Sequence, residues 1–411
     1  MKRDFDLLVV GGAMAGAGVA ALLASNPKTA TLRVALLEPR PATVPAAAEP
    51  LDLRVSALSR TSKRLLELTG AWPAVLTRGA AAYQRMVVWE ERTTPEGPGS
   101  LHFGAAELGE PELGHIAENR AIQSALLERA LAAGVVLLRT GLSSLAPGDD
   151  VIRAGTTDGR EFGATLVIGA DGGDSAVRSH AGIATRGSDY QQRAVVTHLS
   201  CERGHRDTAW QRFLDTGPLA LLPLADGRVS LVWSTEPALA EELVDCPESE
   251  FSERVTAASA SVLGRLEVTA RRASFPLRLL HARRYVAQRV ALIGDAAHTV
   301  HPLAGQGINL AWLDAAALVD VVGEALECGD DAGEPRVLRR YERWRKAEAL
   351  PAIALLDGIK RLFHGGDPLQ SRVRREGLRL VESSGPLKRL LVQRAMGIAG
   401  EVPVSVRQRP S

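Results

Sequence analysis

The sequence predicts an α/β protein in which a Rossmann-type nucleotide-binding fold is interrupted by an antiparallel sheet and followed by helices. A strand, a glycine-rich turn, a helix and a second strand follow one another over residues 6–37. Hairpin-like strands dominate residues 189–276, and a buried strand of the first kind returns at 290–293. With 411 residues, 45% of them hydrophobic, the chain can bury a large core and form two or three domains.

The charge balance and the cysteines exclude several classes of protein. There are 49 Lys and Arg residues against 48 Asp and Glu, so the net charge of +1 attracts neither nucleic acid nor an acidic membrane surface overall. Cys201, Cys246 and Cys328 lie far apart and form no CxxC motif. This pattern fits neither a disulfide framework nor a zinc site, and it predicts buried thiols in a reducing cytosol.

The N-terminal segment is predicted to form a βαβ unit, with strands at Asp6–Val10 and Leu32–Leu37 around a helix at Met14–Ser25. A signal peptide or membrane span is the alternative, because residues 7–24 are uncharged and apolar and follow two basic residues. Two aspartates interrupt the basic region and four glycines fall inside the apolar run. We therefore expect the nucleotide-binding half to start at the N-terminus.

Further elements are expected to pack around this unit. A Pro/Ala-rich connector over 41–50 leads to helices at Thr61–Leu68 and Asn119–Ala132. From Tyr341 the chain is helical, with breaks expected at Pro351 and Pro386. The predicted antiparallel strands, with a hairpin turn at Asp226-Gly227, are Ala194–Cys201, Ala209–Leu214, Pro218–Leu224 and Arg228–Ser234.

The first chemical motif is the turn formed by residues 11–16, which follows the GxGxxG spacing of dinucleotide-binding turns except for Ala13 at the middle position. Gly11 can still make the turn and Gly16 the close packing, whereas the methyl group of Ala13 can shift the backbone contact with a pyrophosphate. Glu38, at the end of the second strand, can accept hydrogen bonds from a ribose diol. A solvated loop glutamate is the alternative.

A second motif is the buried strand Leu166–Gly169 together with Asp171 and Gly172, which follow it closely in the sequence. Open α/β sheets bind ligands at the ends of their strands, so these residues are candidates for a site. An ordinary β-turn that closes a strand explains them equally well.

The third motif is the most informative. The strand Val290–Ile293 leads to Asp295, which can bind sugar hydroxyls, and a glycine loop then opens a helix from about Ile308 to Leu326. The N-terminus of that helix carries a partial positive charge, which suits the N1–C2=O edge of a reduced, anionic flavin. Gly305 and Gly307 let the backbone lie against a flat ring.

Two histidines in the third motif, His298 and His301, are spaced i,i+3 and could suggest a metal. Without nearby Cys or carboxylate partners they make a poor zinc site, so no metal is expected.

Together the motifs occur in the order and spacing of the single-component FAD-dependent aromatic hydroxylases, which the chain resembles over nearly its whole length. Within that group it is similar to the ubiquinone-biosynthesis hydroxylases. The segments specific to that subfamily are Leu53–Leu58 (LRVSAL), Leu113–Arg120 (LGHIAENR), Gln211–Phe213 (QRF) and Gly217–Leu224 (GPLALLPL).

The resemblance implies which residues hold FAD. Those expected at its ADP half are Gly11 and Gly16, with Gly12 and Ala13 of the same turn, and Glu38. Those expected near its ribitol, pyrophosphate and isoalloxazine are Asp295, Pro302, Gly305, Gln306, Gly307 and Asn309. Further flavin contacts are Arg54, Arg120 and Gln123, with Asp171 and Gly172 where the family positions flavin and nicotinamide cofactor.

The predicted division of the chain follows from the same elements. An FAD-binding domain is expected from residues 1–75, 105–182 and 276–340. A substrate domain is expected from 76–104 and 183–275, and a C-terminal helical region from 341–411. This is the α/β architecture typical of aromatic hydroxylases.

The resemblance also implies the reaction. The chain has neither a second GxGxxG nor a redox CxxxxC motif, so the nicotinamide donor should bind transiently. In the family's mechanism NAD(P)H reduces FAD, O₂ adds to give a C4a-hydroperoxyflavin, and its distal oxygen attacks an electron-rich phenol ring. The protein positions the reactants, excludes water and stabilises charge. No side chain is identified as a catalytic base, and for His301 a structural role is the favoured interpretation.

The implied substrate is a polyprenylphenol of ubiquinone biosynthesis. Residues 113–119 and 54–57 look more like the C5 and C6 enzymes than the C1 enzyme, which favours hydroxylation at C5. Candidate apolar wall residues of the substrate pocket, with an ordinary core role as the alternative, are Phe213, Leu219, Leu221 and Trp233.

A prenylated substrate implies a cytoplasmic protein that touches the bilayer peripherally and can belong to a ubiquinone-biosynthesis complex; the oligomeric state is not predicted. Leu387–Met396 mixes leucines with Lys and Arg as a membrane-surface helix does, although an ordinary packing or subunit-interface helix is the favoured interpretation. Rival functions are another flavin-dependent aromatic hydroxylase, a prenyl reductase, and a non-catalytic flavin-binding subunit of a biosynthetic complex. The halogenase signature WxWxIP is absent.

Overall fold

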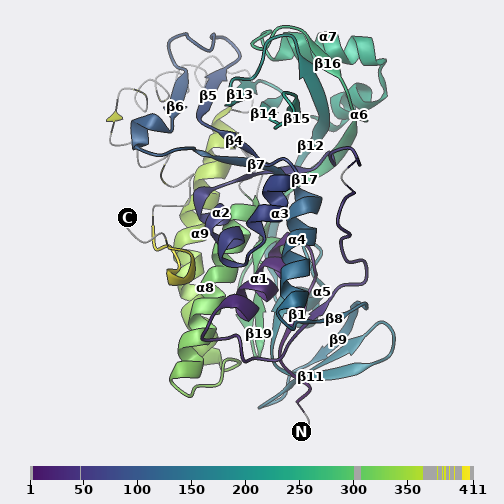
Figure 1. Cartoon of the computed structure of the whole chain (residues 1–411), viewed down its shortest axis with the longest axis vertical. Helices are drawn as coiled ribbons and strands as arrows, with labels where there is room; N and C mark the ends of the chain where they lie inside the picture. Colours follow the sequence, from purple (N-terminus) through teal and green to yellow (C-terminus); the bar gives the residue numbers. More distant parts are fainter. Residues whose placement is uncertain are drawn as a thin grey trace.

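The structure is a computed structural model that describes residues 3–46, 48–299, 307–363 and 400–407, together with positions 377, 382, 384, 385, 388 and 393. Two large sheets lie toward opposite ends of the long axis of this described part (Figure 1). The helices α8 (Gly307–Glu327) and α9 (Pro335–Phe363) run along one side. The predicted α/β fold with an inserted antiparallel sheet is confirmed.

The lower sheet in Figure 1 is the Rossmann-type part. Its strands β19, β11, β1, β2 and β8 pair in parallel in that spatial order, and each is rich in Val, Leu and Ile, as strands covered on both faces require. β18 and the β9–β10 hairpin add antiparallel strands. The bounds are β1 Phe5–Val10, β2 Val34–Leu37, β8 Val136–Leu138, β9 Leu142–Ala146, β10 Ile152–Thr156, β11 Glu161–Gly169, β18 Val286–Ala287 and β19 Val290–Leu292.

Helices cover the faces of this sheet. α1 packs against α4 and α8, where the indole Nε1 of Trp312 donates to the carbonyl of Met14 at 2.9 Å. A small sheet of β3, β7 and β4 lies beside α2 and joins this half to the rest of the molecule. The bounds are α1 Met14–Ser25, α2 Arg60–Leu68, α3 Trp72–Thr77, α4 Asn119–Ala132, α5 Ala176–His180, β3 Val55–Leu58, β4 Ala81–Tyr83 and β7 Gly114–Glu118.

The upper sheet has the order β20-β17-β12-β15-β14-β13-β5-β6, with β16 beside β12. It is antiparallel apart from the β13–β5 pair, which is parallel. One face packs under α6 and α7 and encloses a separate apolar core. The bounds are β5 Arg85–Glu90, β6 Leu101–Gly104, β12 Thr185–Cys201, β13 Thr208–Leu214, β14 Gly217–Pro223, β15 Val229–Thr235, α6 Pro237–Asp245, α7 Glu248–Ala258, β16 Leu266–Val268, β17 Ala273–Ala282 and β20 His298–Thr299.

Two of the apolar cores in the described part of the chain are separate from each other. The larger core joins the parallel sheet to α1, α4 and α8, and the smaller one lies between the upper sheet and α6 and α7. Short one-turn helices lie at Ala106–Leu108 (η1), Gly294–Ala296 (η2) and Val404–Val406 (η4). None of the helices in the described part of the chain is long and apolar enough to cross a bilayer.

The predicted break at Pro351 is wrong, because α9 continues through this residue to Phe363. A proline inside a helix removes one backbone hydrogen bond. Here Ala349 and Ile353, on either side of it, pack against Leu279 and Leu310 and keep the helix continuous. The helix also begins at Pro335, before the predicted start at Tyr341, and Pro386 lies outside the described residues.

Candidate functional site

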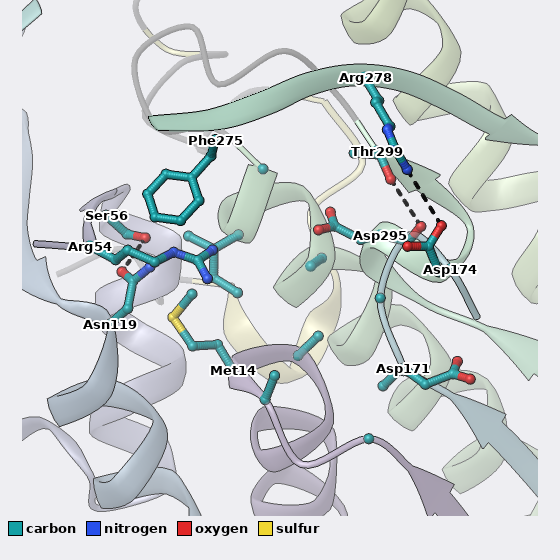
Figure 2. A pocket seen from close by; sticks show the side chains of 18 of the residues that line it. Met14, Arg54, Ser56, Asn119, Asp171, Asp174, Phe275, Arg278, Asp295 and Thr299 are labelled. Atoms are coloured by element: carbon teal, nitrogen blue, oxygen red, sulfur yellow. Dashed lines mark hydrogen bonds and ion pairs between the residues drawn. The ribbon is translucent and has the colours of Figure 1, made fainter. Parts of the chain in front are cut away.

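A cavity of about 880 Å³ lies where the carboxyl ends of the parallel strands meet the upper sheet. This edge is where open α/β sheets bind ligands. The cavity extends from the ends of β2 and β8, past the glycine turn after β1, to the inner face of β12 and β17. Figure 2 shows side chains that project into it, among them Arg54 just before β3, Asp295 in the turn after β19 and Phe275 on β17.

The glycine turn lies against the end of β11 with no room for side chains. Gly11 has a φ of +95°, and a Cβ there would lie 2.6 Å from the carbonyl oxygen of Ala170. A Cβ on Gly16 would lie 1.7 Å from the carbonyl oxygen of Gly11. Ala13 lines the cavity as the residue before α1, with an extended backbone that any residue can adopt. The turn therefore tolerates a methyl group at Ala13 but not at its outer glycines.

Glu38 lines the cavity and receives two backbone hydrogen bonds. Its Oε2 accepts from the N–H of Gly12 at 2.7 Å and its Oε1 from the N–H of Arg40 at 2.8 Å. Gln123, from α4, donates through Nε2 to the carbonyl of Gly12 at 3.0 Å. Gln123 is not among the described residues that line the cavity. Its hydrogen bond therefore stabilises the turn from the side that faces α4.

The two predicted arginines lie in different surroundings. Arg54 lines the cavity, with its guanidinium carbon 5.8 Å from the centre of the Phe275 ring (Figure 2). Arg120 is not among the described residues that line the cavity. Its guanidinium makes a bidentate ion pair with Glu49 in the 41–50 connector. Hydrogen bonding from Arg120 lowers the pKa of Glu49. Arg120 therefore holds the connector in place.

Asp171 and Gly172 line the cavity, but the Asp171 carboxylate is engaged elsewhere. Its Oδ1 accepts from the hydroxyl of Ser175 at 2.5 Å, and its Oδ2 from the N–H of Val177 at 3.0 Å. These contacts hold the start of α5. Gly172 has a φ of +83°, which explains a glycine at this strand end.

Asp295 occupies the short turn η2 after β19, and its side chain is accessible from the cavity (Figure 2). Asp295 is exposed as a residue. Desolvation raises the pKa of its carboxylate, while interactions with His298 and Arg54 act in the opposite direction. The carboxylate can accept hydrogen bonds from the hydroxyl groups of a ligand in the cavity.

The N-terminus of α8 reaches the cavity through Gly307 and Ile308. Asn309 is buried and engaged: its Oδ1 accepts from Ser59 N at 3.0 Å and from Ser62 Oγ at 2.6 Å, and its Nδ2 donates to Ala57 O at 2.9 Å. Asn309 therefore ties α8 to β3 and α2. The predicted residues His301, Pro302, Gly305 and Gln306 lie outside the described residues.

The expectation that His298 lacks a carboxylate partner is wrong. Its Nε2 lies 2.6 Å from Oδ2 of Asp314, and both side chains are buried. Asp314 lies on the apolar face of the predicted helix, where a carboxylate needs a buried partner. This position in the sequence could have predicted the contact. No group of three metal-ligating side chains occurs among the described residues.

Three of the four predicted wall residues face away from the cavity. Leu219, Leu221 and Trp233 pack in the smaller core beneath α6 and α7. Phe213 is buried on the other face, which it shares with Gln211, but it is not among the described lining residues. On β12 the lining residues occupy alternate positions, Ala194 and Val196, and Val232 lines the cavity from β15. The consecutive residues 275–278 of β17 and Thr299 of β20 complete the lining from this sheet.

Comparisons with known proteins were made for the whole chain. Residues 4–354 match the family model described as FAD binding domain. The chain is 36% identical to 3-demethoxyubiquinol 3-hydroxylase of Escherichia coli, over 97% of this chain and 100% of that protein. It is 36% identical to ubiquinone hydroxylase UbiL of Rhodospirillum rubrum, over 95% of this chain and 89% of that protein.

A solved structure shares the fold. The p-nitrophenol 4-monooxygenase PnpA of Pseudomonas putida DLL-E4 superposes with a TM-score of 0.74 over 98% of this chain and 100% of its own, at 18% identity. At this identity the likeness concerns the fold alone.

We predict that Gly16→Ala destabilises the protein by at least about 2 kcal/mol, because the new methyl group would collide with the Gly11 carbonyl. Urea unfolding of the FAD-free protein measures the change. Gly358→Ala is the matched control, since its added Cβ meets no atom within 4 Å in α9 and should stabilise the helix by up to about 1 kcal/mol. Equal effects of the two substitutions would contradict the prediction.

Proposed function

The chain belongs to the FAD-dependent ubiquinone-biosynthesis hydroxylases, and from this premise we propose that it hydroxylates the aromatic ring of a polyprenylphenol at C5 with NAD(P)H and O₂. Family membership makes it a flavoprotein monooxygenase that acts on aromatic rings. The observation that carries the finer proposal is the continuous cavity, which joins a nucleotide-binding strand edge to an apolar sheet face.

The residues of the strand edge fit FAD. The crowded glycine turn lets a pyrophosphate approach the backbone, and the carboxylates of Glu38 and Asp295 line the cavity where they can accept from sugar hydroxyls. Gly307 at the start of α8 offers N–H groups and room for a flat ring. Bound FAD, once reduced by the nicotinamide donor, supplies the chemistry that activates O₂.

The opposite wall of the cavity suits an aromatic ring. Val196, Val232 and Leu277 are apolar, and Phe275 offers a ring face held under the guanidinium of Arg54. These residues would exclude water and orient the phenol, which is the work the protein must do when the cofactor carries the oxidising chemistry. Arg54 is the described cation best placed in the cavity to offset negative charge on phenol or flavin.

The choice of carbon rests on segments near the cavity. Residues 113–119 and 54–57 resemble the C5 and C6 enzymes, and β3 and β7, which contain them in part, pair with each other beside Arg54. The name of the E. coli relative places its hydroxylation at position 3 of a demethoxyubiquinol, which makes that position the second candidate.

Membrane contact and a biosynthetic complex complete the proposal. A polyprenyl tail requires the protein to take its substrate from a bilayer. The segment proposed for this contact, 387–396, lies outside the described residues apart from Lys388 and Gln393.

We predict that Asp295→Ala weakens FAD binding by about 10- to 100-fold, because FAD hydroxyls lose a charged acceptor. Titration of the FAD-free protein with FAD, followed by flavin fluorescence, measures the affinity. Asp174→Ala is the control: this residue also lines the cavity, but its side chain is 94% exposed and pairs with Arg278 at 3.6 Å. An unchanged affinity in Asp295→Ala would remove this residue from the site.

We predict that Ala13→Gly binds FAD as tightly as the natural chain or more tightly. The substitution removes a methyl group that faces the cavity, and glycine is acceptable before a helix. The same titration applies, and a tenfold loss of affinity would show that the turn meets the cofactor in another way.

We predict that deletion of the gene from its host causes accumulation of a prenylphenol that lacks the C5 oxygen. Mass spectrometry of the quinone intermediates identifies it. Accumulation of a demethoxyubiquinol instead would assign position 3, and an intermediate already oxygenated at C5 would refute the C5 assignment while leaving the flavin hydroxylase intact.

A further inference from the structure

A buried polar cluster lies directly behind the turn that carries Asp295. Asp314 on α8 receives His298 Nε2 at 2.6 Å and Arg345 Nε at 2.7 Å. The three side chains are each no more than 1% exposed. Burying these groups is costly, so a cluster kept in the core calls for a function.

One carboxylate oxygen holds both ends of this turn. Oδ2 of Asp314 accepts from the backbone N–H of Gly294 at 3.1 Å and from His298 Nε2. Gly294 begins η2 and His298 begins β20, so Asp295 lies between two residues tied to the same atom. This arrangement restricts the backbone on both sides of Asp295 while its side chain projects into the cavity (Figure 2).

The other carboxylate oxygen connects the turn to α9. Oδ1 accepts from Arg345, and one helical turn earlier the hydroxyl of Tyr341 donates to the carbonyl of Leu292 at 2.8 Å. Leu292 is the last residue of β19, immediately before the turn. Helix α9, whose residues do not line the cavity in the described part of the chain, therefore supports the strand end and the turn together.

Asp314 is suited to this role at neutral pH. Burial acts to raise its pKa, but the neighbouring His298 and Arg345 outweigh burial and keep the pKa below its usual range. The side chain is therefore an ionised acceptor, which makes stronger hydrogen bonds to N–H groups than a neutral one.

We propose that Asp314 is a positioning residue for FAD, which fixes the Gly294–His298 turn so that the Asp295 carboxylate meets the cofactor's hydroxyls. The proposal rests on the assignment of Asp295 to FAD made above. It predicts that removing the contacts of Asp314 with Gly294 and His298 weakens FAD binding, although no residue that lines the cavity is changed.

The main variant is Asp314→Leu with Arg345→Met, which replaces the ion pair by apolar side chains and leaves no unpaired charge. In the FAD-free protein we expect amide hydrogen exchange at 294–299 to accelerate at least tenfold, with exchange in β1 and β11 unchanged. We expect the Kd for FAD to rise at least fivefold. Local exchange is the decisive measurement, because a purely structural role would alter exchange throughout the core.

The matched control is Asp320→Asn on the same helix, whose carboxylate accepts from Ser405 N at 3.2 Å and does not contact the turn. Exchange at 294–299 and the Kd should stay within twofold of the natural chain. Two single substitutions of His298 test its contact with Asp314 and leave the Asp314–Arg345 ion pair intact. His298→Phe should raise the Kd for FAD. His298→Gln, which keeps a side-chain N–H donor, should restore the Kd of the natural chain.

A folded double variant with normal exchange at 294–299 and normal FAD affinity overturns the proposal. If the double variant does not fold, equal Kd values for His298→Phe and His298→Gln overturn it. Asp295→Ala separates this inference from the proposed function. Loss of FAD in Asp295→Ala with normal binding in the Asp314 and His298 variants refutes the positioning role alone, whereas normal binding in Asp295→Ala refutes the assignment on which it rests.

Discussion

The close approach of the β1–α1 turn to the end of β11 is the constraint on which the site depends. The backbone of Gly11 lies against that of Ala170, and Gly16 lies against Gly11. This contact brings α1 to the sheet edge, where Ala13, Met14 and Ala15 line the cavity. Glu38, from the neighbouring strand, can then hold the N–H of Gly12. A side chain larger than hydrogen at either outer glycine would separate these elements and widen the nucleotide end of the cavity.

The acidic residues of the cavity divide according to their partners. Glu38 and Asp171 both accept hydrogen bonds from the protein, so each contributes first to the shape of the site. Asp295 instead presents its carboxylate to the cavity, and burial raises its pKa. A carboxylate that faces the cavity can accept hydrogen bonds directly from the hydroxyl groups of a ligand. We therefore propose the leading part in recognition for Asp295 and a supporting part for Glu38 and Asp171.

Sequence patterns predicted the elements well because they depend on local periodicity. The bounds of α1 and α4 agree with the structure, as does the order of strands around the inserted sheet. Partners across the fold were harder to foresee. Nothing in the sequence separation of Arg120 and Glu49, or of Asn309 and Ser62, indicates that these pairs meet. Alternation along β14 and β15 shows which residues share a face, but only the position of α6 and α7 decides that Leu219 and Trp233 face a core instead of the cavity.

The same alternation explains how related enzymes can share a flavin site and oxidise different carbons. At the nucleotide end of the cavity, close contacts between backbone atoms fix the glycine turn. The opposite wall consists of side chains such as Ala194, Val196 and Val232. The other face of their strands packs in the smaller core. Under the proposed function, exchanging one of these side chains would move the bound ring without disturbing the turn, the strand edge or the smaller core. Since a rotation of the ring presents another carbon to the same oxidant, regiochemistry can change at positions that carry little of the fold's stability.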